Sequence, residues 1–151
     1  MVEVIRDPDE KEAITRKILT ALTDWFEIPE AVEEFIRTSR GQLFLTAKEG
    51  GEAVGFLTLS ETGKATVELH VMGVLKEYHR QGIGRALVEN AKALAAAEGY
   101  SFFQVKTVQY GMYPEYDQTN RFYQACGFKE FEVIPQLWGK DNPCQIYVMS
   151  L

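Results

Sequence analysis

The first forty residues carry hydrophobic side chains at helical spacing, after a short strand-like segment at Val2–Ile5. Asp7-Pro8 is typical of a helix N-terminus, because aspartate caps free N–H groups and proline fits the first turn. The spacing therefore predicts an amphipathic helix up to about Thr23. Trp25–Pro29 interrupts the pattern, and a second helix is expected to follow it and to end near Ser39.

The middle of the chain changes to strand-like patterns. Gln42–Ala47 and Ala53–Leu59 are predicted strands, and Glu49–Gly51 between them is a hairpin turn with glycines where a positive φ is needed. Thr66–Leu75 is the next predicted strand. From Ile83 to Glu98, apolar residues again recur at helical spacing, which predicts a helix with one buried face.

The remaining elements complete an α/β pattern. The sequence predicts strands at Phe102–Val108, Lys129–Ile134 and Gln145–Met149, and a short helix at Thr119–Ala125. The resulting order is β-α-α-β-β-β-α-β-α-β-β, which predicts a mixed, mostly antiparallel sheet with helices packed on its faces. No linker or internal repeat interrupts it, so residues 1–151 are expected to form a single domain.

Composition narrows the classes of protein that this chain can represent. The two cysteines, Cys126 and Cys144, are too few for a disulfide framework, which favours a reducing, cytoplasmic location. A formal charge of −6 argues against a nucleic-acid partner. No apolar run reaches the roughly 20 residues of a membrane span, and the acidic N-terminus does not resemble a signal peptide. No metal site is predicted, and the oligomeric state, a homodimer included, stays open.

A glycine pair offers the clearest functional signal. The predicted strand Thr66–Leu75 leads through a polar loop to Gly82 and Gly84, which open the next helix. Glycines allow close approach of main-chain N–H groups to a ligand, and a helix N-terminus attracts anions. The segment predicts a phosphate or pyrophosphate site. It lacks the P-loop pattern, and Leu87 stands at the third glycine of the dinucleotide fingerprint.

Two motifs resemble those of the GCN5-related N-acetyltransferases (GNAT family). His79-Arg80-Gln81-Gly82-Ile83-Gly84 is similar to the family's [Q/R]-x-x-G-x-[G/A] pyrophosphate loop, although His79 replaces the usual Gln or Arg. Phe122–Phe128 is similar to the family's F-Y-x-x-x-G-F segment. The predicted element order is similar to the family's over nearly the whole chain, although the first forty residues match only in pattern.

The resemblance implies a GNAT-like fold and an N-acetyltransferase that uses acetyl-CoA as acyl donor. It implies direct transfer to a primary amine, of a small molecule or a peptide, in a ternary complex. Main-chain groups of Met72 and Val74 are then expected to contact the pantetheine arm. The residues expected to hold the diphosphate form what we call the glycine loop: His79, Arg80, Gln81, Gly82, Ile83, Gly84 and Arg85.

The resemblance also implies catalytic roles. Tyr123 is expected to donate to the leaving thiolate. An alkylamine, with a pKa of about 10.4, is mostly protonated at neutral pH and needs a base. Glu68 is the expected base, at the spacing found in the histone-acetylating branch and, by strict alternation, on the strand face of Met72. His70 and a relayed water remain alternatives. Cys126 is interpreted as a small apolar residue at a helix end rather than a nucleophile.

The acceptor stays open at this point. The family binds it among its first two helices, their connecting loop and the C-terminal strands, which here carry these aromatic and acidic residues: Trp25, Phe26, Glu27, Tyr113, Tyr116 and Trp138. A catalytically silent acyl-CoA-binding module and a nucleotide-binding regulator are the competing hypotheses.

Overall fold

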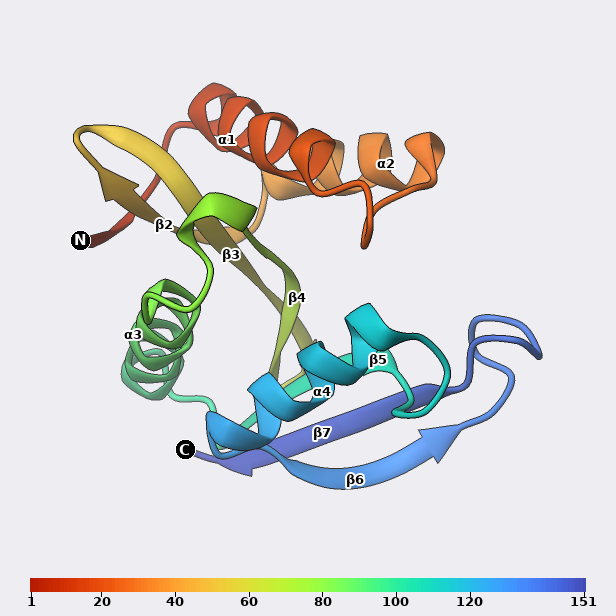
Figure 1. The fold of residues 1–151 in the computed structure, drawn as a ribbon. Coiled ribbons are helices and arrows are strands. Elements are labelled where there is room, and N and C mark those ends of the chain that lie inside the picture. Colours follow the sequence, from red (N-terminus) through yellow and green to blue (C-terminus); the bar gives the residue numbers. More distant parts are fainter. The chain divides into compact units, whose positions relative to one another are not determined.

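The computed structural model describes residues 1–151 and contains a seven-stranded mixed sheet with helices (Figure 1). Its elements in chain order are β1 (Val2–Val4), α1 (Pro8–Ala21), α2 (Pro29–Ser39), β2 (Leu43–Glu49), β3 (Glu52–Gly63), β4 (Thr66–Val74), the 3-10 helix η1 (Lys76–Tyr78), α3 (Ile83–Ala97), β5 (Phe102–Val108), α4 (Pro114–Ala125), β6 (Lys129–Ile134) and β7 (Cys144–Ser150). This confirms the predicted element order and α/β class.

The strands follow the order β1-β2-β3-β4-β5-β7-β6. β4 and β5 are parallel, whereas β1–β2, β2–β3, β5–β7 and β6–β7 are antiparallel. The chain forms two compact units, residues 1–60 with 70–94 and residues 61–69 with 95–151. β3, β4 and α3 contribute to both units. The single domain expected from the sequence stays a prediction.

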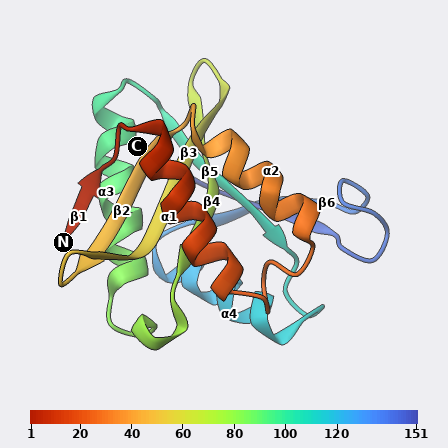
Figure 2. The same cartoon turned by 90° about the horizontal axis from the view of Figure 1, so that it is seen from above.

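The core of the first unit lies between its two N-terminal helices and its strands. In Figures 1 and 2, α1 and α2 lie next to each other on one side of β2 and β3. Ile18 and Leu19 of α1 are completely buried there, and Phe44 stacks on Phe56 with ring centroids 5.4 Å apart. The helical spacing seen in the sequence is therefore the spacing of the side chains that cover the sheet.

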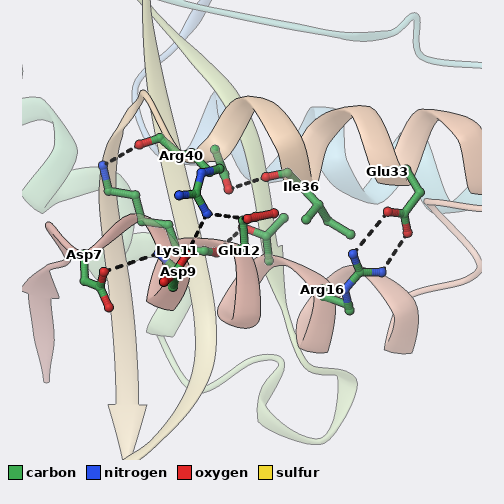
Figure 3. A network of polar contacts seen from close by, with 10 residues as sticks. Asp7, Asp9, Lys11, Glu12, Arg16, Glu33, Ile36 and Arg40 are labelled. Carbon is green, nitrogen blue, oxygen red and sulfur yellow. Dashed lines mark hydrogen bonds and ion pairs between the residues drawn. The ribbon is translucent and has the colours of Figure 1, made fainter.

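Charged side chains fix the register of α1 against α2 (Figure 3). Arg16 donates two hydrogen bonds to the carboxylate of Glu33, at 2.7 and 3.1 Å. Arg40, at the other end of α2, binds Asp9 and Glu12. Exposed pairs of this kind contribute only about 0–1 kcal/mol each. Their main effect is to select one pairing of the two helices, which places the α1–α2 loop (residues 22–28).

A buried lysine lies at the end of the helix pair that is remote from the α1–α2 loop. Lys11 is 8% exposed, and its ammonium group donates to the main-chain oxygens of Arg40 (3.3 Å) and Gln42 (2.7 Å). These carbonyls follow the C-terminus of α2, where a positive charge is favourable. Burial, together with the charge of Arg6, lowers the pKa of Lys11. The contact fixes the main chain that leads from α2 into β2.

Two glycines let helices approach the strands closely. A Cβ at Gly73 of β4 would lie 2.9 Å from Leu22 Cδ1 and 3.0 Å from Ile18 Cγ2, both on the α1 side. A Cβ at Gly55 of β3 would lie 3.2 Å from Leu87 Cδ1 of α3. Gly73 thus makes room for α1, a role that strand patterning alone does not predict.

Exposure alternates along the second half of β4, where Val71 and Gly73 are buried and His70, Met72 and Val74 are half-buried. Val71 belongs to the core beneath α1 and α2, and the ring of His70 lies 5.6 Å from that of Phe35, which packs against the same core. The hydroxyl of Thr58 accepts a hydrogen bond from the Val71 N–H at 3.1 Å. The Thr58 side chain thus binds the main chain of β4 directly.

The second unit is built on β5, β7 and β6, with α4 lying over β5 and β7 (Figure 1). α4 begins at Pro114, so the predicted start at Thr119 was wrong. Tyr113 has extended backbone dihedrals and Pro114 occupies the first turn, which is a regular helix start. The prediction missed it because Tyr116 is the only apolar residue between Pro114 and Thr119, so the helical spacing is weak there. Only Asn120 and Tyr123 of α4 are buried.

Candidate active site

The glycine loop has the backbone of an anion site. Arg80 and Gly82 have positive φ angles of 63° and 79°. The carbonyl of Gly82 accepts the first helical hydrogen bond of α3, from Ala86 N–H at 3.0 Å. The N–H groups of Ile83, Gly84 and Arg85 therefore point out of the helix start without a carbonyl partner inside the helix.

The space in front of this helix start is open. A Cβ built at Gly82 would meet no heavy atom within 4 Å. Arg80 adopts a left-handed conformation that costs a non-glycine residue about 1–3 kcal/mol and that is often found at ligand sites. Free N–H groups, the positive end of the α3 dipole and an open approach are the features by which proteins bind phosphate groups.

The histidine that departs from the family pattern is bound to the main chain of β4. Nε2–H of His79 donates to the carbonyl oxygen of Val74 at 2.6 Å. His79 is exposed, and Val74 and Met72 are half-buried. The structure thus brings together the glycine loop and one of the two expected pantetheine positions within the first unit.

Tyr123 lies on α4 in the second unit, and its hydroxyl has no hydrogen-bond partner in the protein. The residue is 7% exposed, and its ring contacts Phe122, Phe128 and Tyr147. Buried tyrosines usually find a partner for the hydroxyl. Burial, then the neighbouring Cys126 and Tyr116, raise the pKa of Tyr123, so the phenol stays protonated and able to donate.

Tyr147, in the same unit, is a buried tyrosine whose hydroxyl is hydrogen-bonded within the protein. Its hydroxyl donates to Asn120 Oδ1 at 2.6 Å and accepts from Gln124 Nε2 at 3.3 Å. Asn120 is 1% exposed, and its amide donates to the carbonyls of Val108 (2.8 Å) and Tyr116 (2.7 Å). Asn120 therefore connects α4 to β5 and β7, and both its amide nitrogen and its oxygen are hydrogen-bonded.

Glu68 is a buried carboxylate with one engaged oxygen. Its Oε1 accepts from Lys106 Nζ at 2.8 Å and from Gln104 Nε2 at 2.9 Å. Its Oε2 has no partner in the protein. The residue is 7% exposed and pairs with Gln104 across the parallel β4–β5 ladder.

The family of the chain follows from sequence comparison. The family described as "Acetyltransferase (GNAT) domain" matches residues 40–130. A protein of Chlorobaculum tepidum that is named an uncharacterized N-acetyltransferase is 30% identical over 120 residues, which is 78% of this chain and 70% of that protein. This chain belongs to the GNAT acetyltransferase family. It is therefore an acyltransferase, in a family that uses acetyl-CoA.

Solved structures show the same fold along the whole GNAT chain. An IAA acetyltransferase from Bacillus cereus superimposes with a TM-score of 0.76 at 23% identity and covers 100% of both chains. An aminoglycoside 6'-N-acetyltransferase complexed with coenzyme A gives a TM-score of 0.75 at 19% identity, over 98% of this chain and 96% of its own. A GNAT protein from Desulfovibrio desulfuricans gives 0.83 at 19% identity, over 99% of both.

The aromatic residues that the sequence analysis expects to face the acceptor are engaged in different ways. Phe26 lies edge-on to Phe35 in the first unit, with ring centroids 6.1 Å apart. In the second unit, Tyr113 lies edge-on to Tyr116 at 6.1 Å, and Trp138 is 43% exposed. Cys126 is buried at the end of α4, as its interpretation as a small apolar residue predicts.

One residue that sequence reasoning missed is Gln42. Its Nε2 lies 2.9 Å from Nδ1 of His70, and its buried Oε1 accepts no hydrogen bond. Buried carbonyl groups without a partner are rare and costly. A lone polar residue at the start of a predicted strand carries no signal of such a contact. The pair adds a positioned imidazole to the site candidates in the first unit.

No helix of this GNAT chain combines the length and the apolar character that crossing a bilayer requires.

Proposed function

We propose that this acetyltransferase transfers the acetyl group of acetyl-CoA directly to the primary amine of a small molecule or peptide, in a ternary complex. The observation that carries the proposal is the unsatisfied main-chain N–H array at Ile83–Arg85, next to the left-handed Arg80 and Gly82. These groups fit a diphosphate, because each N–H can donate one hydrogen bond to an anionic oxygen.

The residues of the first unit bind the cofactor in this proposal. Main-chain N–H groups from Arg80 to Arg85 hold the diphosphate, and the exposed side chains of Arg80, Gln81 and Arg85 lie on the same loop. Main-chain groups of Met72 and Val74 hold the pantetheine arm. Acetyl-CoA supplies a thioester, whose carbonyl carbon is open to attack by an amine.

Tyr123 stabilises the leaving group in this proposal. When the amine nitrogen attacks, the C–N bond forms and the C–S bond breaks, so negative charge develops on sulfur. The hydroxyl of Tyr123 is protonated and has no internal partner, so it can donate a hydrogen bond to that sulfur. A thiol, with a pKa of about 8.5, is more acidic than a buried phenol, so the proton stays on oxygen. The proton released by the amine balances the charge on the thiolate.

Glu68 receives the amine proton in this proposal. Its Oε2 is available while Lys106 and Gln104 fix Oε1, so the carboxylate is oriented without being fully used. His70 is the alternative base, and its Nδ1 lies 2.9 Å from Nε2 of Gln42. A water relayed by either group completes the set of candidates.

The acceptor is proposed to carry its amine on an apolar or ring-bearing body. Aromatic side chains on the α1–α2 loop and around α4 favour such molecules. Three of the structural neighbours are named aminoglycoside 6'-acetyltransferases, so amino sugars belong in the first substrate panel. Polyamines, lysine and peptide N-termini complete it.

Calorimetric titration with acetyl-CoA, ATP and NAD tests the cofactor first. We expect heat from acetyl-CoA alone. A thiol-release assay over the amine panel then tests transfer. Acetyl-CoA binding without turnover on any amine would favour the silent binding module, and binding of ATP or NAD instead would favour a nucleotide-binding regulator.

A further inference from the structure

His79 connects two segments of the first unit that are far apart in sequence. Its Nε2–H donates to the carbonyl of Val74 at the end of β4, at 2.6 Å. Its ring also lies edge-on to Trp25 of the α1–α2 loop, with centroids 5.8 Å apart and an angle of 69° between the planes. The imidazole therefore touches the strand end and the α1–α2 loop at the same time.

Trp25 is held from η1 as well. Nζ of Lys76, the first residue of η1, lies 5.7 Å from the centroid of the indole ring. The same ammonium group forms an ion pair with Asp24, the residue before Trp25. Lys76 and His79, the two ends of the segment 76–79, thus both contact Trp25. The ammonium group lies over the indole ring, and the imidazole lies edge-on to it.

The α1–α2 loop has little regular structure of its own. Its N–H groups at Trp25 and Phe26 both donate to the carbonyl of Leu22, at 3.2 and 3.0 Å, and Glu27 and Ile28 are exposed. The position of the loop therefore depends on its side-chain contacts, of which those of Trp25 lead directly to the glycine loop.

We propose that His79 is a positioning residue that couples occupation of the glycine loop to the position of Trp25 and of the α1–α2 loop. The inference rests on the proposed function, since it requires a CoA diphosphate at residues 80–85. Arg80, in its left-handed conformation, follows His79 directly. A change of the main chain on diphosphate binding is therefore transmitted to the imidazole and from there to the indole.

Histidine at position 79 can make an aromatic contact that the glutamine found in the family pattern cannot make. A glutamine amide could also donate to the carbonyl of Val74, but it has no aromatic edge for Trp25. The coupling is reciprocal, so a ligand that contacts the α1–α2 loop and a ligand at the glycine loop change each other's affinity by the same factor. An edge-on aromatic contact corresponds to about a 2- to 10-fold effect.

Tryptophan fluorescence tests this coupling, because the chain contains only two tryptophans. In Trp138→Phe protein, the emission reports on Trp25 alone. We expect the emission to change on titration with CoA, with the midpoint that calorimetry gives for the same protein. Trp25→Phe protein, which keeps Trp138, is the matched control, and its emission should stay constant.

His79→Gln in the Trp138→Phe background separates binding from coupling. We expect CoA to bind still, the Trp25 response to disappear, and the KM for the acceptor amine to rise about 2- to 10-fold. Calorimetric binding of CoA with constant Trp25 emission in the protein that keeps His79 would overturn the coupling alone. A full change of Trp25 emission in His79→Gln protein would also overturn the coupling alone. Absence of CoA binding in all variants would overturn the proposed function and this inference with it.

Discussion

The rings of Tyr123 and Tyr147 pack with their centroids 6.2 Å apart, and only the hydroxyl of Tyr147 is bound by the protein. Both side chains are buried in the second unit, but the Tyr123 hydroxyl is not among the buried polar atoms that lack a partner. A hydroxyl without an internal partner is explained when a ligand supplies the acceptor. This contrast defines a matched pair of phenylalanine variants.

Tyr123→Phe is expected to lower kcat by a factor on the order of 10², because a hydrogen-bond donor to the developing thiolate is lost. The Kd for acetyl-CoA should change little, since the hydroxyl acts mainly in the transition state. Steady-state kinetics and calorimetry measure the two quantities. Tyr147→Phe should instead keep kcat and lose about 1–3 kcal/mol of stability. Equal kcat values for wild type and Tyr123→Phe would remove this hydroxyl from the mechanism.

The pH dependence of kcat follows from the raised pKa of Tyr123. The protonated phenol is the active form, and ionisation would remove the donor, so activity is lost only as the pH rises through the raised pKa. An ordinary tyrosine ionises near pH 10, so we expect no alkaline loss of kcat from this group below about that pH. The measurement is kcat at saturating substrates across the alkaline range. A fall near neutral pH that disappears in Tyr123→Phe would contradict the assignment.

Glu68→Gln is expected to lower kcat/KM by about 10² to 10⁴, because the amine loses its proton acceptor. His70→Asn should have a much smaller effect. Lys106→Gln is the control, since it removes the same ion pair and keeps the carboxylate, and it should retain most of the activity. If His70→Asn causes the larger loss, the imidazole is the base, and if neither variant is impaired, proton transfer goes directly to water.

Asn120→Ala tests the structural reading of the α4 contacts. The substitution removes the donor to the carbonyl of Val108 and the acceptor of the Tyr147 hydroxyl, which keeps only its bond from Gln124, at about 1–3 kcal/mol for each buried group. Each kcal/mol corresponds to a fall in Tm of about 2–4 °C for a chain of this size. Gln118→Ala, at an exposed position of α4, is the control. Thermal unfolding with equal midpoints for both variants would show that Asn120 does not fasten the helix.

The glycine loop could be predicted from the sequence because its requirements are local. A positive φ at Gly82 and free N–H groups at a helix start depend on residues next to one another, and the glycine spacing indicates both. Element order was predictable for a similar reason, since apolar spacing decides which face of each helix or strand is buried.

Other features depend on contacts between distant segments and could not be predicted. The hydrogen bond from Val71 N–H to the Thr58 hydroxyl joins two strands, and no local pattern predicts it. Gln42 contacts His70, which lies 28 residues further along the chain. Gly73 leaves room for α1, which packs against that point of β4. The start of α4 was missed because its first turn is mostly polar and only partly buried, so apolar spacing gives little signal there.

The most direct test of the central claim is calorimetric titration of CoA into Gly82→Val and Gly51→Val protein. Both glycines have similar positive φ angles, 79° and 83°, with no neighbouring atoms, so valine strains both backbones alike. Only Gly82 lies in the glycine loop. We predict that Gly82→Val weakens CoA binding about 10-fold or more, the value of one charge-assisted hydrogen bond, while Gly51→Val binds as wild type. Equal Kd values for Gly82→Val and wild type would contradict binding of the CoA diphosphate at the start of α3.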